Sequence, residues 1–321
     1  GGRFQRGQVV LAAGGDIAVG TIDAGATAGD VILIAGSSIT DLDATDPDIT
    51  ADDLTLAALA GGIGLVGNPL ETAVQNIDAG AFAAGIFVAD VGSLTIGGIG
   101  MFAGVGALAG DVAISATGLL TILEQAYAQA GNVSLSAVGM TFAGGVAETG
   151  GAGTVSLQAG TGAISTTGAG NDVLSQNLIA TATTGIDLDT TVLNITATNT
   201  GAGNINIDEV DGANLLNVAA SNGSSAVTSA TGSLNVTTAS ASTTVTLIAT
   251  TGSITDANGG ANNITATALD ATAATGINLD TNVAFITATT TGSGSILLDE
   301  LDAVQLTNVS SANGLITITA G

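Results

Sequence analysis

The sequence predicts an all-β protein folded as a parallel β-helix, or β-solenoid, with coils of about 21 residues. The first observation is a recurring phrase in which Gly is followed by aliphatic residues at every second position. Copies begin at Gly7, Gly29, Gly110, Gly131, Gly153 and Gly314. The second is spacing, because the steps from 7 to 29, 110 to 131 and 131 to 153 are 22, 21 and 22 residues.

Composition is the third observation. Hydrophobic residues make up 46% of the 321-residue chain, which excludes a disordered protein despite its 48 glycines. Only 2% of residues are aromatic, so the chain lacks the large side chains that usually fill a compact globular core. Small and β-branched residues suit a narrow, repetitive interior instead. There is no cysteine, so disulfides do not hold the fold together.

The strands follow in chain order from the period-two alternation. Aliphatic residues at alternate positions, bounded by Gly, Asp and Asn, predict strands over 9–13, 17–19, 31–35 and 54–58. Residues 119–130 (LLTILEQAYAQA) are the best helix candidate in the chain. They occupy a place where the repeat requires a coil, and we therefore predict strand there.

A longer duplication overlies the short repeat. Residues 178–223 and 269–314 align at an offset of 91, and 27 of the 46 paired positions are identical. A fainter relative precedes them, in which Gly62-Ile63, Leu70-Glu71-Thr72 and Val74 match Gly185-Ile186, Leu188-Asp189-Thr190 and Val192. Composition is even throughout, so we predict one continuous β-solenoid over residues 1–321.

Stacking is the reason to expect such a repeat to fold. A single coil cannot bury its own apolar face, whereas a coil placed about 4.8 Å above another gives each strand two neighbours. The interior then becomes a set of aliphatic ladders. Glycine supplies the corners at which one face turns into the next.

Several phrases carry a family resemblance. They stand at 28–31 (AGDV), 49–54 (ITADDL), 68–72 (NPLET), 194–197 (NITA) and 252–254 (GSI). Over nearly the whole chain they resemble the filamentous-haemagglutinin-like repeat regions of large bacterial surface proteins. The resemblance implies a right-handed β-helix, export to the cell surface, and a role as adhesin or structural fibre. The family's secretion domain carries further Asn-Pro signatures that this sequence lacks, since Asn68-Pro69-Leu70 is only a partial match, so this chain looks like the shaft.

Charge excludes several function classes. The net charge is −25, and the only cations are Arg3 and Arg6. Nothing can neutralise phosphates, so we expect no nucleic-acid binding, and an anionic membrane would repel the chain. The most apolar stretch, 99–110, is too short to span a bilayer. Without Lys, His or Cys no usual nucleophile–base pair can form, and an inverting carboxylate pair would lack aromatic residues for sugar stacking. We expect no enzymatic activity.

Acidic residues are the only candidate ligands, and calcium, which takes about six to eight oxygens, is the only cofactor that they suggest. The two groups of candidates are Asp41, Asp43, Asp46 and Asp48, and the duplicated sets Asp208, Glu209, Asp211 and Asp299, Glu300, Asp302. If the offset of 91 is a whole number of coils, the duplicated sets share one edge. The competing interpretation is a solvated acidic loop and charged corners that prevent lateral aggregation.

We therefore expect a structural extracellular β-solenoid, either a shaft segment or a self-assembling subunit of a cell-surface filament. Its partner would be a second copy, stacked end to end through unprotected strand edges. The alternative is an adhesin that binds proteins or glycans of a host or neighbouring cell through 81–102, with Phe82 and Phe87. An ice-binding solenoid, based on Thr-x-Thr pairs such as Thr287 and Thr289, is a weaker alternative. Potential glycan acceptors in Asn-x-Ser/Thr are Asn132, Asn194, Asn222, Asn235, Asn263 and Asn308.

Overall fold

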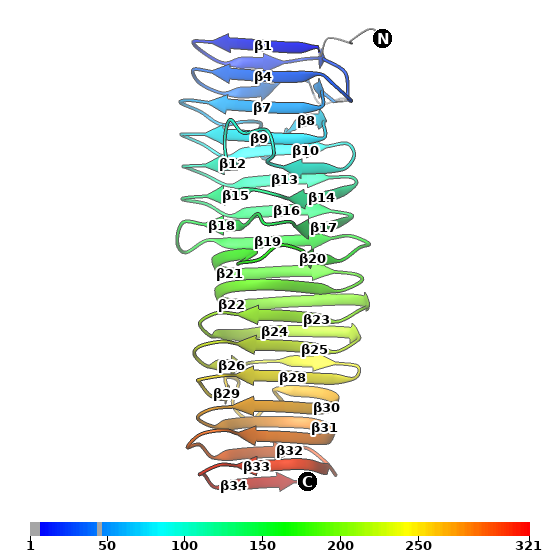
Figure 1. Cartoon of the computed structure of the whole chain (residues 1–321), viewed down its shortest axis with the longest axis vertical. Helices are drawn as coiled ribbons and strands as arrows, with labels where there is room; N and C mark the ends of the chain where they lie inside the picture. The colour runs from blue at the N-terminus through cyan, green and yellow to red at the C-terminus, as the bar shows by residue number, and fades with distance from the viewer. Residues whose placement is uncertain (1–6, 44–46) are drawn as a thin grey trace. The chain divides into compact units, whose positions relative to one another are not determined.

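A computed structural model describes residues 7–43 and 47–321. In these residues the chain has no helix and forms a parallel β-solenoid of about 15 turns with coils of about 21 residues (Figure 1), which confirms the predicted fold class. Contacts within the chain define two compact units. The first comprises 1–160 and 166–175, and the second comprises 161–165 and 176–321. Each unit is described by itself.

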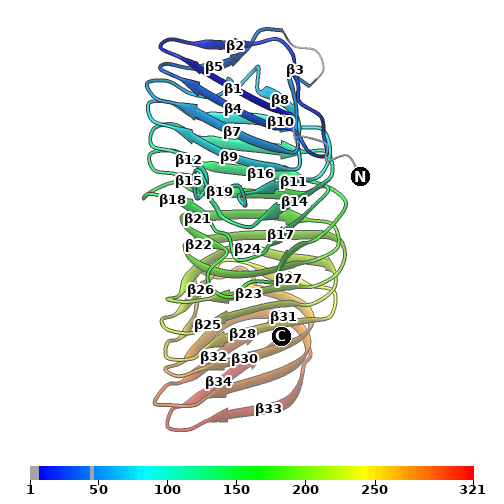
Figure 2. The same ribbon diagram turned by 45° about the horizontal axis from the view of Figure 1, so that its top comes forward.

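Three parallel ladders build the first unit. The first ladder stacks β1 (Gln8–Ala13), β4 (Asp30–Ala35), β7 (Asp53–Ala58), β9 (Asn76–Ala81), β12 (Gly104–Ala107), β15 (Gln125–Ala128) and β18 (Ala147–Thr149). The second stacks β2 (Ile17–Val19) on β5 (Ile39–Asp41), continues through the bridge residue Ile63, and adds β10 (Ile86–Asp90), β13 (Val112–Ala116), β16 (Val133–Ala137) and β19 (Thr154–Ala159). Figure 2 shows β1, β4, β7 and β9 in successive layers.

The third ladder has two parts. Its first part stacks β3 (Ile22–Asp23), β6 (Ile49–Thr50) and β8 (Leu70–Ala73). Its second part stacks β11 (Leu94–Ile96), β14 (Leu119–Ile122) and β17 (Gly139–Phe142). Residues 119–130, the best helix candidate by sequence, are therefore two strands, β14 and β15, as predicted. β20 (Ile164–Thr166) and β21 (Val173–Ala182) have residues in both units.

The recurring phrase builds the core because its alternate aliphatic residues stack on their own counterparts. Val112, Val133 and Val155 form one column, and all three are 0% exposed. The next column consists of Ile114, Leu135 and Leu157. Each such side chain contributes about 1.5–3 kcal/mol by its burial. Every coil thus presents an apolar face that only the adjacent coils can cover.

Glycine opens the phrase because backbone lies on backbone at this corner. A Cβ at Gly131 would overlap the carbonyl oxygen of Gly110, and a Cβ at Gly153 would overlap that of Gly131. Gly110 also has a φ of +85°, a left-handed conformation that favours glycine. The leading glycines are therefore required by the distance between coils.

The second unit uses longer strands that turn a corner without a break. One ladder runs from the start of β22 (Ile186–Ala202) through β23 (Ile205–Glu209), β25 (Ser225–Ser229), β28 (Thr244–Ala249), β30 (Ile264–Ala273) and β31 (Ile277–Thr290) to β33 (Gln305–Ser311). The other faces contain β24 (Ala213–Asn222), β26 (Leu234–Val236), β27 (Ala239–Ala241), β29 (Ile254–Asp256), β32 (Ile296–Glu300) and β34 (Ile316–Ala320).

A column of amides reinforces the second unit. Asn194 donates from Nδ2 to Asn177 Oδ1 at 2.8 Å, Asn214 donates to Asn194 at 2.9 Å, and Asn235 donates to Asn214 at 2.9 Å. Thr255 Oγ1 closes the column on Asn235 Oδ1 at 2.6 Å. Each half-buried amide thus finds its partner one coil away, as in the side-chain ladders of stacked strands.

The duplication of 178–223 and 269–314 is not a whole number of coils. In the column of stacked residues that contains Ile186, Leu269 lies four coils later and Ile286 lies five coils later. The residue equivalent to Ile186 is Ile277, which lies between them and stacks on Ile254 in a different ladder. The expectation that the two copies share one edge is therefore wrong, because the second copy is displaced by one face.

Gly131→Ala is expected to lower the free energy of unfolding by about 1–3 kcal/mol, because the added methyl group forces two coils apart. The matched control is Gly151→Ala, where a Cβ meets nothing within 4 Å and should change stability by less than about 0.5 kcal/mol. Urea denaturation followed by circular dichroism measures both. Equal midpoints for the two variants would show that the corner has room for a side chain.

Candidate functional site

The acidic stretch that begins at Asp41 converges only in part. Asp41 ends β5, Asp48 immediately precedes β6, and the carboxyl oxygens of both lie within 4.8 Å of each other and of Glu71 in β8. We call these three residues the acidic cluster. Asp43 is exposed and is not part of it, and Asp46 lies outside the described residues.

Glu71 is the member that sequence reasoning did not name as a ligand. It follows Asp48 by 23 residues, which is about one coil. The main chains of the two residues are paired, since the Asp48 amide donates to the Glu71 carbonyl at 2.8 Å. Asp48 Oδ2 in turn accepts the Glu71 amide at 3.1 Å. A search for acids one coil apart, rather than adjacent in sequence, would have found this neighbour.

Electrostatics in the acidic cluster are unfavourable. Asp48 is 1% exposed, and Asp41 Oδ2, Asp48 Oδ1 and Glu71 Oε2 are buried without a hydrogen-bond partner. Burial raises the pKa of Asp48 to about 7, and the nearby negative charges of Asp41 and Glu71 also raise it. The described residues contain no Lys, Arg or His that could balance these carboxylates. The cluster therefore needs a proton or a cation.

The duplicated acids divide into inward and outward side chains. Glu209 and Glu300 are each 1% exposed. Glu209 Oε2 accepts the Thr190 hydroxyl at 2.6 Å, and Glu300 Oε2 accepts the Thr281 hydroxyl at 2.6 Å. In both cases the amide two residues after the threonine also donates to the carboxyl group. These two acids serve the fold and leave Asp208, Asp211, Asp299 and Asp302 as the exposed members.

A third copy of this arrangement lies in the first unit. Asp90 is 2% exposed, and its Oδ1 accepts the Thr72 hydroxyl at 2.9 Å and the Val74 amide at 3.0 Å. We call the arrangement the buried-acid clamp, with Asp90, Glu209 and Glu300 as its acids. The fainter repeat at Leu70–Val74, recognised from sequence, thus conserves within this chain a specific hydrogen-bonding unit. Each clamp joins a corner to the next coil.

The outward acids form stacked pairs. Asp208 stacks on Asp189, and Asp299 stacks on Asp280. Burial raises the pKa of Asp189, and the charge of Asp208 adds to the effect. The two exposed sets do not meet, because Glu209 pairs with Ser229 in one ladder while Glu300 pairs with Thr281 in another. A shared calcium site for both sets is therefore excluded, and a separate site at either remains a prediction.

Aromatic side chains gather at one surface hollow of the first unit. A cavity of about 170 Å³ is lined by Phe82, Phe102 and Tyr127 together with small apolar residues. Asp78 holds the loop that carries Phe102, since its Oδ2 accepts the Gly100 amide at 3.0 Å and the Phe102 amide at 3.3 Å. Phe87, paired with Phe82 in the sequence hypothesis, lines a different hollow with Pro69.

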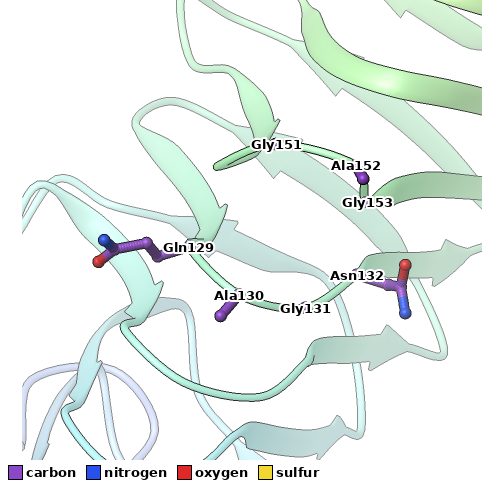
Figure 3. Close-up of a pocket in the computed structure, with 7 residues that line it drawn as sticks. All are labelled: Gln129, Ala130, Gly131, Asn132, Gly151, Ala152 and Gly153. Carbon is purple, nitrogen blue, oxygen red and sulfur yellow. The ribbon is translucent and has the colours of Figure 1, made fainter.

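A larger hollow, of about 370 Å³, lies between two successive turns of the first unit (Figure 3). It is lined by residues 129–132 and 151–153, and none of these is charged. The two long side chains, Gln129 and Asn132, point in opposite directions. Asn132 Oδ1 accepts the Thr154 amide at 2.9 Å, so this side chain is part of the coil-to-coil bonding. The residues that line this hollow include no side chain suited to act as a nucleophile or as a general acid or base.

The Thr-x-Thr pair of Thr287 and Thr289 is not repeated in the adjacent coils. Thr287 stacks between Asp270 and Asn308, and Thr289 stacks between Thr272 and Ser310. The ice-binding alternative therefore gains no support. Two of the Asn-x-Ser/Thr positions, Asn194 and Asn235, use their amides in the asparagine column, whereas Asn222 and Asn308 are exposed.

Stability is expected to rise when the pH falls from about 8 to about 5.5. The pKa of Glu209 is raised to about 7, chiefly by burial, and burial also raises the pKa of Asp78 and Asp90. A carboxyl with a raised pKa in the folded state contributes stability below its usual value of 4.5, and this contribution is lost as the pH rises through 7. Urea midpoints at the two pH values measure the difference.

Glu209→Gln keeps the shape of the clamp but removes its titration. This variant should reduce the gain in urea midpoint on acidification, whereas Asp23→Asn, at an exposed position, should leave the gain unchanged. A wild-type midpoint that is the same or lower at the acidic pH would contradict the assignment of buried, protonatable carboxyls.

Comparison with known proteins gives no assignment. No protein-family model, curated protein or solved structure matches this chain. Among the described residues there is also no helix with the length and apolar character needed to cross a membrane. The fold and the arrangement of acidic and aromatic residues are therefore the basis for any functional conclusion.

Proposed function

We propose that this chain is a structural extracellular β-solenoid, a shaft segment or self-assembling subunit of a cell-surface filament. The observation that carries the proposal is the fold itself. In each unit the apolar columns pass from coil to coil, and most of the buried polar groups serve corners or clamps. Such an interior provides length and stiffness, and repeat proteins of this kind are stabilised by neighbouring repeats.

Among the described residues, the first and last coils each have one strand edge without a paired strand. The carbonyls of Gly7, directly before β1, and of Ala13, at its end, accept the Asp30 and Gly36 amides. Because successive residues of a strand direct their N–H and C=O groups to opposite sides, Val10 directs its own groups away from β4. Directly before β34, the Leu315 carbonyl accepts the Ile296 amide, so the first residue of the strand, Ile316, directs its own N–H and C=O groups away from β32.

These edges fit two forms of the same proposal. Further coils of a longer polypeptide would pair with them in a shaft, and a second copy would pair with them in a filament. The net charge of −25 supports either form, because like charge on the faces opposes lateral association of sticky sheets. End-to-end pairing then remains the favoured contact, and salt should strengthen it.

In the self-assembling form, the purified 321-residue chain should form filaments visible by negative-stain electron microscopy at about 0.5 M NaCl, where charges are screened. Val10→Pro removes an outward N–H from the free edge and should raise the concentration needed for assembly by about tenfold. Sedimentation velocity measures that concentration.

Val10→Thr is the matched control, since it keeps the amide and a side chain suited to strands, and it should assemble like the wild type. Thermal melting of all three proteins under non-assembling conditions checks that the coil itself is intact. A chain that remains strictly monomeric at every salt and protein concentration would rule out the self-assembling form.

An adhesin is the second candidate, and the aromatic hollow formed by Phe82, Phe102 and Tyr127 favours it. Aromatic faces exposed at a surface are suited to stacking on apolar or ring-shaped ligands. The residues that line the hollow include no charged side chain to orient a ligand. The structural role therefore ranks first.

A further inference from the structure

The geometry points to a calcium site in the first unit, at which Asp41, Asp48 and Glu71 bind one Ca²⁺ ion that fastens β5, the start of β6, and β8. The inference does not depend on the filament or adhesin role. It rests on two independent features of the acidic cluster. One is convergence, because oxygens of the three carboxyl groups lie within 4.8 Å of one another.

The second feature is a buried oxygen without a partner. Asp48 is 1% exposed, and its Oδ1 is buried with no hydrogen-bond donor, although its Oδ2 accepts the Glu71 amide. Asp41 Oδ2 and Glu71 Oε2 share this condition. Other buried carboxyl oxygens also lack a hydrogen-bond partner, among them Asp78 Oδ1 and Asp90 Oδ2, so the distinguishing feature of the acidic cluster is that three carboxyl groups with such an oxygen converge. An oxygen left bare beside two others is suited to a cation.

The donor set selects a hard divalent ion. All three ligands are carboxylates, and nitrogen and sulfur ligands that favour zinc or copper are missing from the cluster. Calcium binds oxygen at about 2.3–2.6 Å, so two ligands on opposite sides of one ion lie about 4.8 Å apart. Magnesium needs about 2.1 Å and a strict octahedron. A loose group of carboxylates on three separate segments therefore favours calcium, with water and main-chain oxygens completing its shell.

The ion would act as a fastener. Asp41 is the last residue of β5, Asp48 directly precedes β6, and Glu71 comes from β8, which pairs with β6 one coil later. A bound ion would tie β5 and the start of β6 to the strand of the following coil. Without the ion, three like charges would push the same elements apart, unless Asp48 retains a proton.

Isothermal titration of the whole chain with CaCl₂, in about 0.15 M NaCl to screen weak surface binding, tests the inference. Wild-type protein should bind one more Ca²⁺ per chain than Asp48→Asn. Calcium at about 100 times its dissociation constant should raise the thermal midpoint by roughly 5 °C relative to EGTA. Magnesium at the same concentration should give a smaller shift.

Hydrogen exchange places the effect in the structure. Peptides that cover 39–50 and 68–75 should gain protection in calcium, whereas peptides of the second unit should not. Asp43→Asn, an exposed neighbour of the cluster, is the matched control and should keep the calcium response. In EGTA, Asp48→Asn should melt above the wild type, because it removes a buried charge next to two others.

Arg3→Gln with Arg6→Gln removes the only cations in the chain. If the double variant keeps the calcium response, the ion and not an arginine neutralises the negative charge of the acidic cluster, as proposed. Several outcomes would overturn the inference. They are an equal number of calcium ions bound by wild type and Asp48→Asn, an unchanged melting midpoint in calcium, or protection that appears only away from 39–75.

Discussion

Coil-to-coil register is the constraint on which the rest of this structure depends. Once the backbone of one coil is hydrogen-bonded to the next, every residue stacks on a counterpart about one coil away in sequence. Val112, Val133 and Val155 then make an apolar column, and the glycines that precede them must let carbonyl groups pass closely. The recurring pattern of glycine and alternate aliphatic residues is therefore a consequence of the stacking of successive coils.

The same coil-to-coil register also stacks polar side chains on one another. A column of asparagines is self-satisfying, because each amide both donates and accepts, as in Asn194 and Asn214. A column of carboxylates cannot be, because ionised carboxylates only accept. Each clamp acid accepts a hydrogen bond from a threonine hydroxyl one coil away. At Asp41, Asp48 and Glu71, by contrast, one carboxyl oxygen of each residue is buried without a donor. The same stacking geometry thus produces both the satisfied polar columns and the acidic cluster.

Much of the fold could be predicted because strand periodicity and coil length are both local signals. Residues 119–130 show this, since the repeat correctly predicted strands there although the segment itself resembles a helix. Pairing across coils could not be predicted as well, because coil length varies. The step is 24 residues from Val245 to Leu269 but 17 from Leu269 to Ile286, and such changes shifted the second copy of the duplication onto another face. Glu71 was missed for the same reason, since its proximity to Asp48 depends on one coil of variable length.

Residue-by-residue native-state hydrogen exchange tests the central claim, that each coil is held by its neighbours through this register. Amides of β13 and β16, which are paired with strands of the first unit on both sides, should exchange most slowly. Amides of β1, and of β33 and β34 in the second unit, should exchange faster, because stability in a stacked repeat decreases towards unpaired edges. Equal and rapid exchange in β13 and β34 would contradict the account.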